Sequence, residues 1–128
     1  MNNIQIKTIP NLDQKYSTVG DYYWQDGDIQ VRVSDMQNAV YEMAVVIHEL
    51  TEIQWCLENN VTLEASTIFD IQFERERTQG LHKQNDEPGD DSRCPYWQGH
   101  QIATIVEKKF IKLMGKKWRE YDKAVMSL

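Results

Sequence analysis

Alternating apolar and polar residues near the N-terminus predict three short strands. Residues 4–9 alternate in this way and are followed by Pro10, which is typical of an edge strand. Two further runs, over about 18–25 and 28–33, flank Asp26-Gly27, a dipeptide that favours the positive backbone angles of a tight hairpin. The pattern therefore predicts a small N-terminal antiparallel sheet made of a hairpin and an edge strand.

Apolar residues at helical spacing predict helices over most of the remaining chain. The first covers about 35–59, with Ser34 and Gln37 forming a capping box at its start. Three more helices are predicted, over about 63–77 with Thr62 as the N-cap, over about 96–114 before Gly115, and over about 117–126. Together with the sheet they define an α+β fold, in which three to four helices pack on one face of the sheet.

The second predicted helix and the segment after it are rich in polar residues. Asp70 and Glu74 stand four residues apart on that helix, and we interpret them as a solvated face paired with Arg77. The segment of about 78–95 contains many turn-forming residues and is predicted to be a loop. Loops of this length are uncommon in compact domains and are often functional or mobile.

The composition is that of an ordinary soluble globular protein. The 128 residues are 41% hydrophobic and 27% charged, and the length predicts a single domain over residues 1–128. The longest apolar run, Met43 to Ile47, is far shorter than the roughly 20 residues of a membrane span, and the start MNNIQIKTIP lacks an apolar signal-peptide core. We therefore expect a cytoplasmic protein with no membrane partner, in which Cys56 and Cys94 are thiols.

The net charge of -6 is unevenly distributed along the chain. Residues 108–128 hold seven basic and two acidic residues, whereas the preceding chain is acidic. The basic block 108–119 could contact phosphate or the acidic remainder of the same protein, and we favour the second interpretation because a solvated helical face needs no partner. The acidic total, with no visible recognition motif, argues against sequence-specific DNA binding.

A charged motif, HELTE over residues 48–52, interrupts the most apolar predicted helix. Buried charges are costly unless they are paired or bound to a metal. His48 and Glu52 stand four residues apart on one helix face, which is how a helix holds a metal, and Glu49 beside them is positioned to reach a metal-bound water. The competing interpretation is a hydrogen-bonded core histidine next to a surface-facing pair of glutamates.

This motif resembles the HExxH helix of the zincin metallopeptidases, which also follows a strand. The resemblance implies that His48 is a metal ligand and that Glu49 is the general base. The second histidine of the family pattern is replaced by Glu52 here, and a carboxylate ligand suits Mg²⁺ or Mn²⁺ as well as zinc. The expected cofactor is therefore a divalent metal, either zinc or one of those two ions, and the replacement puts peptidase activity in doubt.

A second pair of candidate ligands lies on the predicted helix 96–114. His100 and Glu107 share one helix face, because seven residues make nearly two turns. Either of them could complete a site begun by His48 and Glu52. For His100 taken alone, the alternative is a capping or exposed histidine near a helix start.

The acidic loop before this helix supplies further candidates. Asp90 and Asp91 could lie over the site, and Arg93 and Trp97 follow them as candidate contacts to substrate or phosphate. Arginine pairs with phosphates and aromatic side chains stack on bases. The alternative is that this acidic loop is merely solvated.

Several strings spread over most of the chain resemble those of a group of small, functionally uncharacterised bacteriophage and prophage proteins. They are YSTVGDYYW, RVSDMQN, VVIHELTE, EPGDDSRCPYW and GHQIATIVEKK. The resemblance implies a phage context, and thus the host cell cytoplasm, but no particular reaction.

Two functions of different classes are consistent with these features. The first is a small metal-dependent hydrolase with His48, Glu52 and His100 as ligands, Glu49 activating water, and Glu107 as a further ligand or as a hydrogen-bond partner of one. Its substrate would be a phosphoryl or acyl compound. The second is a non-catalytic phage anti-defence protein that binds a host protein or sequesters a nucleotide signal. The sequence leaves the formation of a homo-oligomer open.

Overall fold

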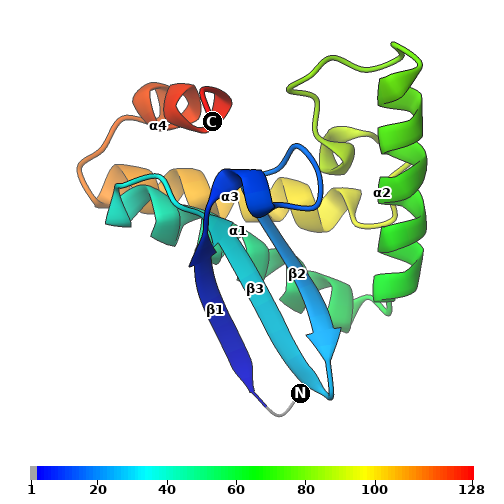
Figure 1. Ribbon diagram of the computed structural model, residues 1–128. Helices are drawn as coiled ribbons and strands as arrows, with labels where there is room; N and C mark the ends of the chain where they lie inside the picture. Colours follow the sequence, from blue (N-terminus) through cyan, green and yellow to red (C-terminus); the bar gives the residue numbers. More distant parts are fainter. Residues whose placement is uncertain (1–2) are drawn as a thin grey trace.

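The computed structural model describes residues 3–128 and has a three-stranded sheet at its N-terminal end (Figure 1). The strands are β1 (Ile4–Ile9), β2 (Gly20–Gln25) and β3 (Asp28–Ser34), and their order in the sheet is β1-β3-β2. The hairpin between β2 and β3 is antiparallel, as predicted. Its turn places Asp26 at φ 52° and Gly27 at φ 81°, the left-handed angles that the Asp-Gly pair favours.

The sheet is mixed rather than antiparallel throughout, because β1 runs parallel to β3. The connection from β1 includes a short 3-10 helix, η1 (Asn11–Asp13), and crosses to the far edge of the sheet before β2 begins. The strand β3 then returns between the other two. Alternation along a strand sets which side chains face the core, but it does not set the direction of the neighbouring strand, so the prediction of an antiparallel partner for β1 was wrong.

Four helices follow the sheet: α1 (Ala39–Glu58), α2 (Leu63–Thr78), α3 (Trp97–Leu113) and α4 (Trp118–Met126). The α+β prediction is therefore confirmed. The helix α2 begins after Thr62, whose side chain accepts a hydrogen bond from the Ala65 backbone N–H as expected of an N-cap.

The start of α1 differs from the predicted capping box. Its N-cap is Asn38, whose side chain accepts from the Tyr41 backbone N–H at 3.2 Å. Gln37 lies outside the helix at φ 52°, and Ser34 ends β3. Asparagine is as good an N-cap as serine, and the four-residue difference lets the chain turn out of the sheet before α1 begins.

The helix α1 packs against β2 and β3 on one side and against α3 on the other (Figure 1). The main core joins the buried faces of β3 and α1 and is completed by Ile111 from α3 and Tyr121 from α4. This arrangement buries α1 between two layers, which explains its nearly continuous apolar sequence. Polar side chains in the middle of α1 are therefore enclosed by protein.

The segment between α2 and α3 is held by hydrogen bonds in its first part and by the buried side chains of Cys94 and Tyr96 at its end. The guanidinium of Arg77 donates hydrogen bonds to the backbone carbonyls of Lys83, Gln84 and Asp86. A short 3-10 helix, η2 (Pro88–Asp90), follows and packs against α3.

Both cysteines are buried free thiols, as predicted. Among residues 3–128, no helix is long and apolar enough to cross a membrane.

Candidate metal centre

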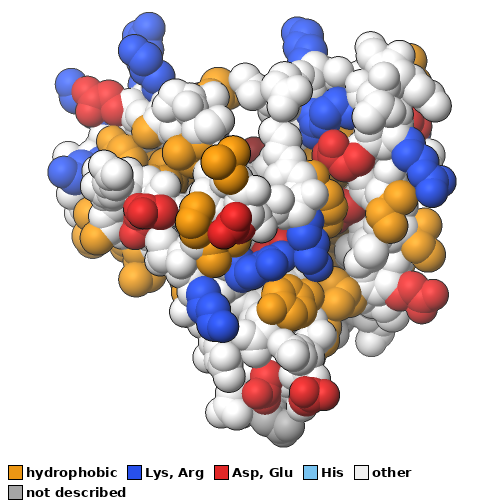
Figure 2. All heavy atoms as spheres, in the orientation of Figure 1, with side chains coloured by type: hydrophobic (Ala, Val, Ile, Leu, Met, Phe, Trp, Pro, Cys, Tyr) orange, Lys and Arg blue, Asp and Glu red, His pale blue; other side chains and the backbone are white. Residues whose placement is uncertain are grey.

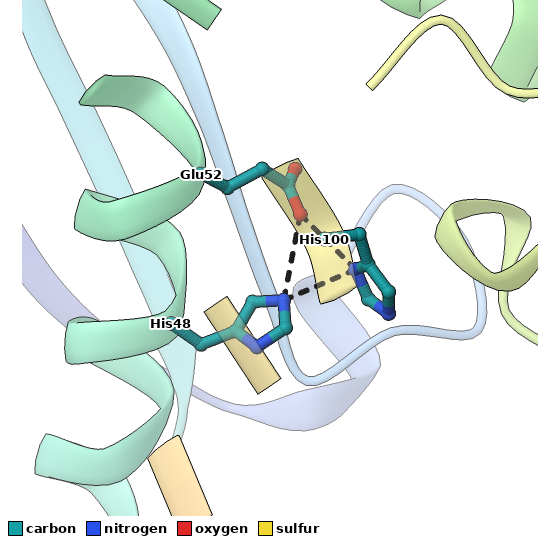
Figure 3. Close-up of side chains that lie close together, drawn as sticks. All are labelled: His48, Glu52 and His100. Carbon is teal, nitrogen blue, oxygen red and sulfur yellow. Dashed lines mark hydrogen bonds and ion pairs between the residues drawn. The ribbon is translucent and has the colours of Figure 1, made fainter. Parts of the chain in front are cut away.

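His48, Glu52 and His100 converge in the buried space between α1 and α3 (Figure 3). His48 and Glu52 lie one turn apart on α1, and His100 faces them from the first turns of α3. The His48 Nε2 atom is 3.1 Å from His100 Nδ1 and 3.4 Å from Glu52 Oε2, and the latter two atoms are 3.1 Å apart. Three potential ligand atoms therefore form a nearly equilateral triangle.

The size of this triangle fits a single tetrahedral metal ion. Zinc binds histidine nitrogen and carboxylate oxygen at about 2.0–2.2 Å, so two ligands at the tetrahedral angle are about 3.3–3.6 Å apart. The three observed separations, 3.1, 3.1 and 3.4 Å, lie within a few tenths of an ångström of that value. A tetrahedral ion has four ligand positions. The three protein atoms would fill three of them, so the fourth is left for water or substrate.

Each histidine uses its other ring nitrogen to contact a carboxylate. The Nδ1–H of His48 donates to Glu107 Oε1 at 2.8 Å. The Nε2–H of His100 faces Glu87 Oε2 at 3.0 Å and Asp90 Oδ1 at 3.4 Å. Such contacts fix the tautomer and the ring orientation of metal-ligating histidines, and here they aim both remaining nitrogen lone pairs at the centre of the triangle.

Glu107 was predicted to be either a metal ligand or a hydrogen-bond partner of a ligand, and its position favours the second role. Its carboxylate contacts the outer nitrogen of His48 and accepts a further hydrogen bond from the Tyr121 hydroxyl. It is not part of the group of converging ligand atoms. Glu107 therefore orients His48 from behind, and Tyr121 on α4 in turn orients Glu107.

The carboxylates govern the protonation of the cluster when no metal is bound. Burial works to lower the pKa of His48, but hydrogen bonds to Glu107 and Glu52 outweigh it and raise the pKa to about 10. Burial likewise opposes the charging of His100, whereas Asp90, Glu52 and Glu87 raise its pKa to about 12. Burial raises the pKa of Glu52, and its hydrogen bonds to both histidines lower it overall. The site thus attracts positive charge strongly.

The three inner atoms can share a proton or a metal ion. If both rings were doubly protonated, two N–H groups would face each other across 3.1 Å. A single proton on His100 Nδ1 would form hydrogen bonds with Glu52 Oε2 and His48 Nε2. If neither inner nitrogen carried a proton, two lone pairs and a carboxylate oxygen would converge on one point, where a divalent cation would contact all three acceptors at once.

Glu49 lies beside the triangle without belonging to it. It is only 8% exposed, and no side chain within residues 3–128 forms a hydrogen bond or an ion pair with its carboxylate. Burial, and after it the neighbouring Glu52, raises the pKa of Glu49 to about 8. At this pKa the carboxyl group is largely protonated near neutral pH in the metal-free site. A cation held by the triangle would lower the pKa and favour the ionised carboxylate, which can take a proton from water.

The triangle and Glu49 open into a cavity of about 570 Å³. Its walls come from β2 and the segment before it, from all four helices and from the η2 region. Asp70 lines this cavity and accepts a hydrogen bond from the Tyr96 hydroxyl at 2.6 Å. Burial raises the pKa of Asp70 to about 7. Asp70 was predicted to lie on a solvated helix face, and the structure instead encloses it partly within the cavity.

Two glycines allow close packing around the site. A Cβ atom at Gly20 would lie 2.7 Å from Val45 Cγ1 and 2.8 Å from Glu49 Oε1. A Cβ atom at Gly89 would lie 2.4 Å from the Cγ and Nδ1 atoms of the His100 ring. The backbone at these two positions thus confines Glu49 and His100. No sequence signal identified either contact.

The structure brings together some of the predicted site residues and not others. His48, Glu49, Glu52, Asp90, His100 and Glu107 all line the cavity. Asp91 and Arg93 form an ion pair at 2.7 Å with each other, and Arg93 also pairs with Glu76 at 2.8 Å. Neither they nor Trp97 line the cavity. Glu87 and Tyr121 are contacts that the sequence interpretation missed, because neither position is part of a spacing pattern shared with the HELTE motif.

The basic residues do not form one continuous surface on the face drawn in Figure 2. Lys and Arg side chains lie there in separate groups, with acidic side chains between them. From the basic block 108–119, Lys108 stacks over the ring of Trp118 with Nζ 5.1 Å from the ring centroid. Both residues belong to the block, so this contact does not test whether the block contacts the acidic remainder of the protein.

No family model matches the chain, and no curated protein or solved structure is significantly similar to it. The resemblances to zincin peptidases and to small phage proteins therefore remain predictions. The buried His/Glu group stands on its geometry alone: it could hold a metal ion.

Proposed function

We propose that this protein is a metal-dependent hydrolase whose metal is held by His48, Glu52 and His100. The observation that carries the proposal is the convergence of three ligand atoms 3.1–3.4 Å apart, with a carboxylate behind each histidine. Two imidazoles and one carboxylate form a ligand set typical of catalytic zinc. Manganese accepts the same donors, whereas magnesium prefers oxygen ligands, so we expect zinc first and manganese second.

The reaction is hydrolysis of an acyl or phosphoryl compound. When bound, the metal supplies Lewis acidity, which acidifies water and polarises the substrate oxygen. Glu49 takes one proton from the attacking water. The water oxygen forms a bond to the electrophilic atom, the bond to the leaving group breaks, and Glu49 returns the proton to that leaving group.

The surrounding residues hold this arrangement in place. Glu107 keeps His48 in the required tautomer, and Glu87 with Asp90 does the same for His100. Gly20 lets the β2 backbone approach the Glu49 carboxylate closely. The cavity is large enough for a substrate of moderate size.

Metal binding by matched histidine variants tests the proposal. We expect untagged protein to bind one zinc ion per chain, and His48→Ala and His100→Ala to lose it. His82→Ala is the control, because the ring of His82 stacks on Phe73 and contacts Glu76, outside the cavity. Equal zinc binding by all three variants would refute the ligand assignment.

The ion pairs of Arg93 favour the hydrolase over a protein that sequesters a nucleotide signal. Arg93 was a predicted phosphate contact, and its guanidinium is shared between Asp91 and Glu76. An anionic ligand would have to compete with both carboxylates. A nucleotide that bound in the micromolar range without any metal would reverse this preference.

A further inference from the structure

The walls of the cavity carry mostly negative charge. Nine of the side chains that line it are Asp or Glu, and Lys15 is its one lysine or arginine within the described part of the chain. A bound divalent metal would offset only part of this charge. A phosphate-bearing substrate would enter against a strong repulsive potential, whereas a positively charged one would be attracted.

Several of these carboxylates already have a cationic partner. Asp21 pairs with Arg32 at 2.5 Å, and Glu74 pairs with Arg77 at 3.0 Å. Asp70 differs from them, because no Lys, Arg or His within residues 3–128 forms an ion pair with it, and its one hydrogen-bond donor is the neutral Tyr96 hydroxyl. Asp70 is therefore free to receive a cation from a ligand.

Aromatic rings accompany the acidic groups. Tyr16 and Tyr96 are among the aromatic residues that line the same cavity. Tyrosine and tryptophan faces attract ammonium and guanidinium groups, most strongly where water is excluded. Acidic and aromatic side chains together are the usual means of recognising an organic cation.

Glu49 independently indicates that the cavity is built for a ligand. It is only 8% exposed, lines the cavity, and forms no hydrogen bond or ion pair with any side chain that the structure describes. A buried carboxylate without a partner is costly. Such a group is retained where a bound molecule supplies the missing contact.

We propose that the substrate is a cationic acyl compound, such as a peptide or amide with a lysine-like or arginine-like side chain, whose charge is bound by Asp70. This inference rests on the proposed hydrolase and narrows its substrate class from acyl or phosphoryl compounds to positively charged acyl compounds. The metal centre binds the carbonyl end, and Asp70 selects the side chain.

Three small hydroxamates provide a matched test, because a hydroxamate chelates zinc and so brings each probe to the same point. They are the hydroxamates of Nα-acetyl-lysine, Nα-acetyl-norleucine and Nα-acetyl-glutamate. Their dissociation constants are measured by calorimetry on zinc-loaded protein at pH 8, above the pKa of about 7 of Asp70. Because a hydrogen bond to a charged group is stronger than a neutral one, the lysine probe should bind at least about tenfold more tightly than the norleucine probe. The glutamate probe should bind most weakly.

Asp70→Asn tests the residue assigned to selectivity. The amide still accepts from Tyr96, so the variant removes charge with little change in shape. We expect the preference for the lysine probe over the norleucine probe to disappear in Asp70→Asn and to persist in Asp13→Asn, an exposed aspartate that does not line the cavity.

The outcomes separate this inference from the proposed function. Tight binding of all three probes with no preference for lysine, or with a preference for glutamate, would overturn the substrate class and leave the metal centre in place. A lysine preference that survives in Asp70→Asn would overturn the role of Asp70. If the protein holds no zinc and binds none of the probes, the proposed function fails and this inference fails with it.

Discussion

Replacing Glu107 with glutamine changes the charge behind His48 without removing a metal ligand. The Glu107 carboxylate receives two donors, His48 Nδ1–H and the Tyr121 hydroxyl. In Glu107→Gln, the amide oxygen still accepts from His48, and the amide NH₂ donates to the Tyr121 oxygen once that hydroxyl turns away. The packing is thus preserved, and what is lost is the negative charge that makes His48 a stronger ligand.

The expected loss of metal affinity follows from other metal sites in which a carboxylate contacts a metal-bound histidine. Loss of a carboxylate behind a metal-bound histidine typically weakens metal affinity 10–100-fold, or about 1.4–2.7 kcal/mol. At saturating zinc this free energy is lost from the stability of the folded state. For a chain of 128 residues the unfolding entropy is about 0.27 kcal/mol/K, so the Tm of the zinc-loaded protein should fall by about 5–10 °C.

Zinc affinity is measured by competition with a chromophoric chelator, and Tm by calorimetry with and without zinc. Glu120→Gln is the matched control, because Glu120 is exposed and lies on α4 near Tyr121 without lining the cavity. The control should keep the zinc affinity of the unmodified protein. An unchanged zinc affinity in Glu107→Gln would refute the orienting role given to this residue.

Three further changes address other parts of the site. Glu49→Gln should keep zinc and abolish turnover of any substrate found, since it removes a proton acceptor and not a ligand; zinc loss measured by metal analysis would instead make Glu49 a ligand. Gly89→Ala should weaken zinc binding at least about tenfold, because the new Cβ would displace the His100 ring; undiminished affinity in the chelator assay would contradict this. The pKa of Asp70 is raised to about 7, so its protonated form favours the folded state, and that contribution is lost as pH rises from about 4 through about 7. Urea unfolding should therefore show Asp70→Asn gaining stability relative to the unmodified protein between pH 5 and pH 8, and a constant difference would contradict the raised pKa.

The sequence was most informative where a periodic pattern coincided with an energetic conflict. The i,i+4 spacing of His48 and Glu52 within an apolar helix indicated that these polar groups are buried together. The helix face shared by His100 and Glu107 indicated a second helix that contributes side chains to the same site. Packing of α3 against α1 brings these two faces together (Figure 3), so periodicity was enough to predict which side chains meet.

Other features depended on information that spacing does not carry. Which nitrogen of His48 meets Glu107 is set by the rotation of the ring, and this decides whether Glu107 is a ligand or an orienting group. Glu87 lies in a non-periodic segment, and its approach to His100 depends on how Arg77 holds the preceding loop by backbone carbonyls. The direction of β1 relative to β3 was likewise not predictable from the alternation of apolar and polar residues.

The most direct test of the central claim is a crystal structure of the zinc-loaded protein with anomalous data collected at the zinc absorption edge. The account predicts one anomalous peak per chain at about 2.0–2.2 Å from His48 Nε2, Glu52 Oε2 and His100 Nδ1. The same data examine the second group of potential ligands, Glu87, Asp90 and the outer nitrogen of His100. A peak at that outer group alone would contradict the account. So would the absence of any peak in crystals grown with excess zinc.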